Sequence, residues 1–331
     1  MMKQDKWRSL LKKIIRIFFI LILLGVCFTG FELFISRYWL TTTRYTISSN
    51  RIDHPFRVVQ LTDLHDSEFG RDNKKLISRV RRENPDIILI TGDLVNNKKG
   101  EDTSIATTLI SGLTDIAPVY FSYGNQEVDL EENNQIDIKR LFTEAGAVVM
   151  DKDYQDITVN GQKIRLGGIY GYCMPARYAN EVRSEDESVY LKDFQNTELY
   201  TIFMCHMPVS WLKYGSLYDW NIDCVFAGHT HGGQVRIPFV GGLWAPDQGW
   251  FPGEMCGVYT TEKEKWDNYM KDAEGWTENE NLDGSYYKDY LLKTEYKPSS
   301  LVLSRGLGNT DKIPRFNNIP EIVVVDFLGD K

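Results

Sequence analysis

Closely spaced cysteine pairs are absent from this sequence. Its five cysteines show no CxxC spacing, so nothing in their pattern indicates a zinc finger or a disulfide framework. Cys205 and Cys224 lie within apolar runs, where a free cysteine usually serves as a small buried hydrophobic residue. We therefore assign no disulfide and no zinc finger.

An excess of positive charge is also missing. The chain has 38 Lys and Arg residues against 46 Asp and Glu residues, a formal net charge of -8. Nucleic acid is held mainly by clustered Lys and Arg side chains. No such cluster occurs beyond the N-terminus, so we expect no nucleic-acid groove. The 331 residues and 42% hydrophobic content predict a substantial core, in one large α/β domain or two small ones.

The N-terminal region joins a basic segment to a long apolar run. Residues 1–13 carry several Lys and Arg side chains, and residues 14–35 would form a helix of about 33 Å, enough to span a bilayer. Aromatic residues typical of a membrane interface flank the run at Trp7, Tyr38 and Trp39. By the positive-inside rule, we expect a single-pass cell-membrane anchor with a cytoplasmic tail, a juxtamembrane segment at residues 36–55 and an extracytoplasmic domain.

A cleaved signal peptide is the alternative interpretation, because such peptides also begin with a basic segment and an apolar core. No small-x-small cleavage site follows this run, and Val26 before Cys27 makes a poor lipobox. The uncleaved anchor is therefore the favoured interpretation.

Beyond residue 55, strand-like runs alternate with helical patterns, which is typical of an α/β domain. The strand candidates are FRVVQL from Phe56, DIILI from Asp86, PVYFSY from Pro118, LYTIFM from Leu199, DCVFA from Asp223, LVLS from Leu301 and EIVVVDF from Glu321. We expect helices near residues 73–83, 103–113 and 135–145. The pair Asn160-Gly161 predicts a hairpin turn.

Residues 261–297 differ from the rest in composition. They are polar and also rich in Trp and Tyr, so we interpret them as an insertion. A solvated surface excursion is the simpler expectation, and a lid that contacts substrate is the alternative.

Groups that can bind metal follow the strand candidates between Phe56 and Ala227. In chain order they are Asp63, His65, Asp93, Asn125, His206, His229 and His231. Because the carboxyl ends of strands in an open α/β sheet lie along one edge, we expect these groups to converge in one crevice. The chain has five histidines, and His54 alone lies outside this set. The sequence therefore predicts a metal centre at this edge.

The motifs TDLH, TGDLV, GNQE, CHMP and GHTHGGQ, followed by SRGLGNTDKIPRFNNIPEI, occur in this order. With them the sequence resembles the calcineurin-like metallophosphoesterases, in particular a bacterial membrane-associated branch. The resemblance implies a four-layer α/β/β/α sandwich over residues 56–331, interrupted by the insertion and preceded by one transmembrane helix.

The resemblance also implies a role for each ligand. Asp63, His65 and His231 would hold one divalent metal ion, Asn125, His206 and His229 would hold a second, and Asp93 would bridge the two. This mixture of oxygen and imidazole ligands suits Mn, Fe or Zn. A hydroxide bridging the ions would attack phosphorus, with Asp93, Asn125 and Gln126 as the catalytic residues.

Gln126 departs from the family pattern, which usually has a histidine at this position. An amide can donate a hydrogen bond to a phosphoryl oxygen but cannot supply a proton. Loss of a general acid typically costs about 10²- to 10⁴-fold in rate. Three accounts stay open: a substrate whose leaving group is stable as an anion, another acid such as Glu127, or a homologue that binds ligand with weakened catalysis.

The expected function is a membrane-anchored phosphoesterase that cleaves a phosphodiester or pyrophosphate bond in a phosphorylated small molecule or lipid, with its catalytic domain outside the cytoplasm.

Gly232, Gly233 and Gln234 are expected to form a tight loop beside the metals. Polar residues near the C-terminus could bind phosphate or serve only surface packing, and we leave them outside the site: Arg305, Asn309, Arg315 and Asn317.

Overall fold

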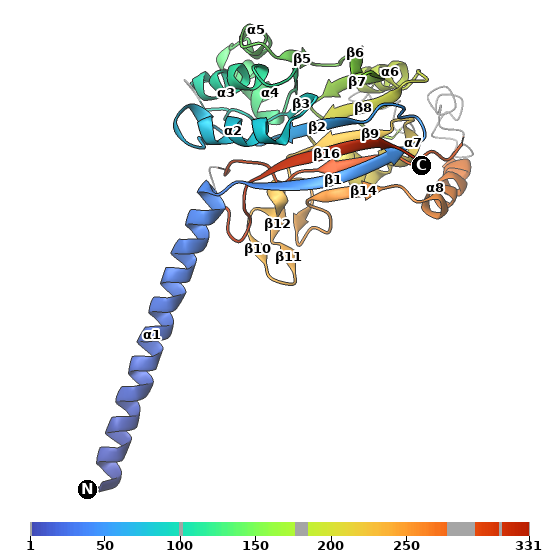
Figure 1. Ribbon diagram of the computed structural model, residues 1–331. Coiled ribbons are helices and arrows are strands. Elements are labelled where there is room, and N and C mark those ends of the chain that lie inside the picture. The colour runs from blue at the N-terminus through green and yellow to red at the C-terminus, as the bar shows by residue number, and fades with distance from the viewer. Residues whose placement is uncertain (1, 99–101, 176–184, 277–294, 311–312, 331) are drawn as a thin grey trace.

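The computed structural model describes residues 2–98, 102–175, 185–276, 295–310 and 313–330. Two six-stranded sheets stack face to face, and helices cover their outer faces (Figure 1). This arrangement of helix, sheet, sheet and helix confirms the expected four-layer α/β/β/α sandwich.

The first sheet has the strand order β1-β16-β2-β3-β4-β5. Its strands are β1 (Thr41–Ser49), β16 (Glu321–Gly329), β2 (Phe56–Leu61), β3 (Ile87–Thr91), β4 (Val119–Ser122) and β5 (Val148–Met150). Strands β2 to β5 are parallel, whereas β16 is antiparallel to β2. The outer face is covered by α2 (Lys74–Glu83), α3 (Ser104–Thr114), α4 (Asn125–Asn134) and α5 (Ile138–Glu144).

The second sheet has the strand order β14-β15-β9-β8-β7-β6. Its strands are β14 (Gly257–Thr260), β15 (Ser300–Leu303), β9 (Cys224–Ala227), β8 (Tyr200–Cys205), β7 (Gln162–Ile169) and β6 (Asp153–Val159). On its outer face, α6 (Glu185–Phe194), the π-helical turn Ser210–Tyr214 and α7 (Ser216–Asp219) bury Phe194, Trp211 and Leu217.

The core between the sheets explains why the central strands are apolar along their whole length. Val58 and Leu89 of the first sheet pack in one cluster with Ile164 and Ile202 of the second. The alternate residues of the same strands pack under the helices, so that every residue of β3 is buried. A strand covered on both faces reads as a continuous hydrophobic run.

The strands and helices predicted from the sequence are confirmed, as is the hairpin turn between β6 and β7. Asn160 and Gly161 have φ values of 47° and 87°, the two left-handed positions that a two-residue turn of this kind requires. One expectation was wrong. Residues 36–55 are not merely a juxtamembrane connection, because β1 within them forms the edge of the first sheet and pairs in parallel with β16.

Helix α1 (Met2–Tyr38) projects from one end of the body (Figure 1). Its Trp7–Tyr38 segment is long and apolar enough to cross a membrane, and none of its most apolar part is buried. A signal sequence would meet the same criteria. The helix joins the body where β1 and β16 begin, since Thr41 pairs with Glu321.

Two short hairpins extend from the body on the side from which α1 projects (Figure 1). They consist of β10 (Arg236–Ile237) with β11 (Gly241–Gly242), and β12 (Trp244–Ala245) with β13 (Gly249–Trp250). Neither hairpin was predicted, because these strands are too short to show a periodic pattern.

The segment read as an insertion begins with α8 (Lys263–Trp276), which lies at the opposite end of the body from α1 (Figure 1). Tyr269 of α8 stacks on Tyr218 of the body at 5.5 Å, and Trp266 lies 6.0 Å from Tyr296 at the other end of the same segment. Residues 277–294 of this segment lie outside the described residues.

Candidate metal centre

The carboxyl ends of β2, β3 and β4 in one sheet meet those of β8 and β9 in the other, and the predicted ligands follow these ends. Five of the ligands adopt left-handed backbone conformations with φ between 46° and 69°: Asp63, His65, Asp93, His229 and His231. Such φ values are uncommon outside glycine and are typical of functional sites, where the surrounding structure maintains them. Here the chain turns sharply at each strand end and directs the side chain into the crevice.

Close packing of the backbone makes glycine necessary beside Asp93. A Cβ atom on Gly124 would collide with the Asp93 carboxylate. Gly92 has φ 82°, and a Cβ there would collide with the main chain of Gly124. The Gly-Asp and Gly-Asn pairs seen in the sequence are therefore a requirement of packing between adjacent strand ends.

The ligands form two groups that share Asp93. Asp63, His65, Asp93 and His231 each offer one atom, and these atoms lie within 4.8 Å of one another. Asp93, His206 and His229 form a second group by the same measure. All of these residues are buried. Six of the seven side chains predicted from the strand ends thus lie together.

Hydrogen bonds orient two of the imidazole rings. His206 Nδ1 lies 2.7 Å from the carbonyl oxygen of Thr91, and His65 Nδ1 lies 3.1 Å from Asn96 Oδ1. In each case the partner is an acceptor, so Nδ1 carries the proton and Nε2 keeps its lone pair for a metal ion.

The ring of His229 is held in the opposite sense. Its Nε2 lies 2.9 Å from the carboxylate of Asp247, so Nε2 donates and Nδ1 keeps the lone pair. This Nδ1 lies 3.2 Å from His206 Nε2. Two nitrogen lone pairs that face each other are favourable when a cation lies between them.

Several polar atoms at the centre are buried without a hydrogen-bond partner among the described residues. They are His65 Nε2, Asn125 Oδ1 and His231 Nδ1. Buried polar atoms are nearly always satisfied, and these three all belong to residues predicted as ligands. The donor set therefore fits metal ions, and it includes Asn125, which begins α4.

The electrostatics of the centre also favour bound positive charge. Burial opposes ionisation of Asp93, but His206, His65 and His229 outweigh it and lower the pKa of this carboxyl below its ordinary value. Burial opposes protonation of His206, yet Asp93 raises the pKa of its imidazole to about 10. A bound cation would take the place of that proton. Burial, together with repulsion from His65, lowers the pKa of His231, which keeps this ring neutral as a ligand must be.

Glu127 has a structural role, so the suggestion that it could act as a replacement acid was wrong. Its carboxylate accepts hydrogen bonds from the main-chain N–H groups of Asp93 and Gly124, both at 2.8 Å, and of Leu94 at 2.7 Å. The side chain is fully buried and is not among the residues that line the cavity. Burial, with repulsion from Asp93, raises the pKa of Glu127 to about 7.

Gln126 lies at the cavity wall beside the shared carboxylate. Its main-chain N–H donates to Asp93 Oδ1 at 2.9 Å, and its side-chain Oε1 accepts from the Asn97 N–H at 3.2 Å. Gln126 is one of the residues that line the cavity, and its amide NH₂ is a hydrogen-bond donor.

The remaining polar residues that the sequence singled out lie around the centre. Gly232 and Gly233 form the expected tight loop, as part of the 3-10 turn His231–Gly233 with Gly232 at φ 61°. Arg315 does not serve surface packing. It is 1% exposed, and its guanidinium donates to the carbonyl oxygens of Gly308 at 2.6 Å and His231 at 3.3 Å. It therefore supports the loop that carries His231.

A cavity of about 580 Å³ opens over the ligands. Its polar wall includes His65, Asp93, Asn125, His229 and His231. Its other wall is apolar and comes mainly from the two hairpins, with Val235, Leu243, Trp244, Pro246, Trp250 and Ile313. None of the described residues of the segment 261–297 lines the cavity.

Sequence reasoning missed Asn96 and Asp247, which orient His65 and His229. Asn96 follows the TGDLV motif directly, and a second polar group so close to a ligand is a usable signal. Asp247 lies in a turn 18 residues after its partner. No local pattern links the two positions.

Comparison with known proteins places the chain in a family. The calcineurin-like phosphoesterase model matches residues 56–233. The uncharacterized metallophosphoesterase YkuE of Bacillus subtilis (strain 168) is 27% identical over 70% of this chain and 78% of its own length. The phosphodiesterase YaeI of Escherichia coli (strain K12) is 29% identical over 58% of this chain and 66% of its own length.

Among solved structures, the 5'-nucleotidase precursor of Thermus thermophilus has a TM-score of 0.38 and 13% identity, over 75% of this chain and 54% of that one. A score this low supports no comparison of function. The family model covers the ligands from Asp63 to His231, and the clustered side chains indicate divalent metal binding. The chain therefore belongs to the calcineurin-like phosphoesterase family, and this membership supports a phosphoester hydrolase.

Proposed function

We propose that this protein is a membrane-anchored, two-metal phosphoesterase that hydrolyses a phosphodiester or pyrophosphate bond. The observation that carries the proposal is the position of Asp93, whose carboxylate belongs to both ligand groups. One buried carboxylate between two sets of imidazole and oxygen donors is the arrangement expected of a bridging ligand.

Each ion would be held by residues that already point into the crevice. One ion would bind Asp63, His65 and His231, the other would bind Asn125, His206 and His229, and Asp93 would contact both. Nitrogen and oxygen donors without thiolate suit Mn, Fe or Zn. When bound, two such ions supply an acidified water as nucleophile and stabilise the charge that develops on the phosphoryl oxygens.

The chain's own residues orient the ligands and the substrate. Thr91, Asn96 and Asp247 fix the three histidine rings, so that little reorganisation is needed when the reaction occurs. The amide of Gln126 can donate a hydrogen bond to a phosphoryl oxygen but cannot protonate a leaving group. This property favours substrates whose leaving group is stable as an anion, such as pyrophosphates.

The membrane anchor supports a lipid-linked substrate. The carboxyl ends of β2 to β4 lie at the same edge of the first sheet as the start of β16, because β16 runs antiparallel to β2, and α1 joins the body at that edge. The metal centre is therefore close to the end of α1. In the proposed orientation, the N-terminus is cytoplasmic and the centre faces the outer surface of the membrane.

Metal titration followed by a substrate screen tests this function. The full chain in detergent micelles is stripped with chelator and titrated with Mn²⁺, Zn²⁺ or Fe²⁺, and hydrolysis of phosphomonoesters, phosphodiesters and pyrophosphates is then measured. We expect two ions per chain and the highest kcat/KM on pyrophosphates or activated diesters. Binding of one ion, or full activity without metal, would contradict the two-metal proposal.

Gln126 also supports a second candidate function. A homologue that has kept its ligands but lost its proton donor could act as a ligand-binding or sensory protein. This candidate predicts near-complete inactivity on every leaving group despite two bound ions. Turnover of pyrophosphates at ordinary enzymatic rates would rule it out.

A further inference from the structure

The two hairpins beside the metal centre carry large apolar side chains that face solvent. We call this set the hairpin surface, and it comprises Ile237, Phe239, Val240, Trp244, Trp250 and Phe251. Phe239, at the tip of the first hairpin, is fully exposed, and Trp250 is 68% exposed. Single exposed apolar residues are common on soluble proteins, but six on two short hairpins, four of them aromatic, indicate an interaction site.

Backbone strain accompanies this exposure. Phe239 and Phe251 have φ values of 67° and 51°. Bulky residues rarely adopt such values, and each costs about 1 kcal/mol or more. Packing of these two side chains against the body does not offset the strain energy, since both rings are largely exposed to solvent.

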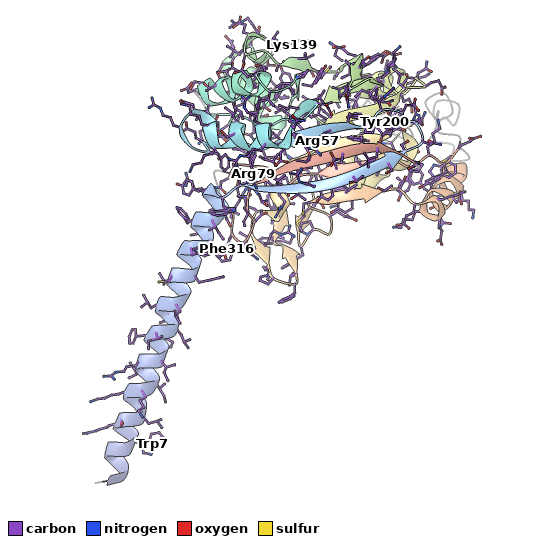
Figure 2. All side chains as sticks on the ribbon, viewed as in Figure 1. Trp7, Arg57, Arg79, Lys139, Tyr200 and Phe316 are labelled. Carbon is purple, nitrogen blue, oxygen red and sulfur yellow. The ribbon has the colours of Figure 1, made fainter. Side chains whose placement is uncertain are left out.

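The position of the hairpin surface relative to α1 identifies what it faces. The ring of Phe316 lies 6.4 Å from that of Phe28 in α1, and the carbonyl of Phe316 accepts a hydrogen bond from Arg236 at the start of β10. Figure 2 shows Phe316 beside the helix. Phe28 lies seven residues inside the apolar run that ends at Ile35, roughly 10 Å along a helix. The base of the first hairpin is therefore level with the apolar part of α1.

A second contact fixes the body against the end of the helix. The main-chain N–H of Asn318 donates to Ser36 Oγ at 3.3 Å, and both residues are buried. The first hairpin extends beyond this junction on the side from which α1 projects (Figure 1). If α1 crosses a bilayer, that bilayer meets the hairpin surface.

We propose that the hairpin surface enters the interfacial layer of the bilayer that α1 crosses, and that the cavity takes a phosphorylated amphiphile directly from this bilayer. The phosphate would lie at the metal centre, and the apolar chain would lie along the wall formed by Leu243, Trp244 and Trp250. The statement about substrate rests on the proposed phosphoesterase activity, whereas the membrane contact rests only on the proposed anchoring by α1.

Two observations support the continuity of this path. Trp244 and Trp250 belong both to the hairpin surface and to the cavity wall, so that one apolar surface leads from the bilayer side to the ligands. Tryptophan is also the side chain that membrane interfaces favour, because its ring is apolar while its N–H can reach water or head groups.

Fluorescence quenching tests the membrane contact without any need for activity. The full chain is placed in phosphatidylcholine nanodiscs with or without brominated acyl chains, which quench nearby tryptophan. Phe239→Trp places a new tryptophan on the hairpin surface. Val189→Trp is the control, since Val189 on α6 is an apolar residue, 53% exposed, on the outer face of the second sheet. The signal of the wild-type chain is subtracted from each.

We expect bromolipid to quench at least half of the signal added by Phe239→Trp and almost none of that added by Val189→Trp. Equal quenching of the two signals would overturn the membrane contact. Quenching that is stronger for bromine near the head group than for bromine deep in the chain would support an interfacial depth.

Kinetics test the substrate. The two substrates are bis(p-nitrophenyl) phosphate in solution and a nucleotide joined through pyrophosphate to diacylglycerol in nanodiscs. Phe239→Asp should lower the ratio of lipid to soluble kcat/KM by about tenfold, because it removes one apolar membrane contact and introduces charge. Val189→Asp should leave the ratio unchanged.

An unchanged ratio for both variants would overturn delivery from the bilayer. If the metal-loaded wild type hydrolyses neither substrate, the proposed function and the delivery both fail, while the quenching result still decides the membrane contact.

Discussion

His229 Nε2 lies 2.9 Å from the carboxylate of Asp247, in the turn between β12 and β13. The hydrogen bond to His229 lowers the pKa of Asp247, which keeps this carboxylate ionised. It also leaves His229 Nδ1 directed at His206. The hairpin that carries Trp244 and Trp250 thus also orients a predicted metal ligand.

Asp247→Ala should weaken metal binding on the His229 side of the centre. Loss of a carboxylate that orients a histidine ligand typically costs about 10- to 100-fold in metal affinity. Isothermal titration should show one weakened site and one unchanged site, and added metal should restore most of kcat. Asp267→Ala on α8, whose partner is Lys263 at the surface, is the control. Equal weakening of both sites would contradict the assignment of His229 to one ion.

Asp93→Asn should remove hydrolysis while it preserves the fold. The amide oxygen can still accept the Gln126 N–H that Asp93 Oδ1 accepts at 2.9 Å, but the charge shared by both ligand groups is lost. We expect kcat/KM to fall by at least about 10³-fold, with an unchanged far-UV circular dichroism spectrum. A variant with wild-type rates would show that the reaction does not depend on a bridging carboxylate.

Gln126→His should change selectivity more than overall rate. A histidine can protonate an alkoxide, so hydrolysis of alkyl phosphate esters should accelerate by about 10²-fold or more. Pyrophosphates, whose leaving group is stable as an anion, should gain much less. Measurement of kcat/KM over a leaving-group series gives the result. Equal acceleration of all substrates would contradict a specialised enzyme.

Glu127→Gln should destabilise the fold. The buried carboxylate accepts from the N–H groups of Asp93, Leu94 and Gly124, and an amide NH₂ in place of one oxygen would face donors. We expect a loss of about 2–3 kcal/mol in the free energy of unfolding, measured by urea titration. Glu132→Gln, at an exposed position of the same helix, should change it by less than about 0.5 kcal/mol.

The orientation in the membrane can be measured at Lys139. This exposed residue of α5 lies on the side of the body away from α1 (Figure 2). Lys139→Cys, in a chain with Cys27 and Cys256 replaced by serine, should react with an impermeant maleimide in intact cells. Reaction only after lysis would place the catalytic domain in the cytoplasm.

The sequence by itself determined the central strands and the side chains that cluster at the candidate metal centre. Strands buried on both faces read as continuous apolar runs, and a predicted ligand such as Asp93 or His206 follows such a run within two residues. The end of a strand is a local feature, and strand ends gather at an edge whatever the later connections are. The layering of the two sheets came only from family resemblance. The hydrophobic pattern of a strand indicates which residues are buried, but it does not indicate which sheet or helix they pack against.

Only the tertiary structure decided how these side chains are supported. Asp247 orients His229, Arg315 lies buried behind His231, and Glu127 faces the main chain instead of the cavity. The same holds for β1 at the sheet edge and for Phe316 against Phe28. Each of these relations joins segments that fold together from different parts of the chain, and the direction of a side chain toward such a partner leaves no local pattern in the sequence.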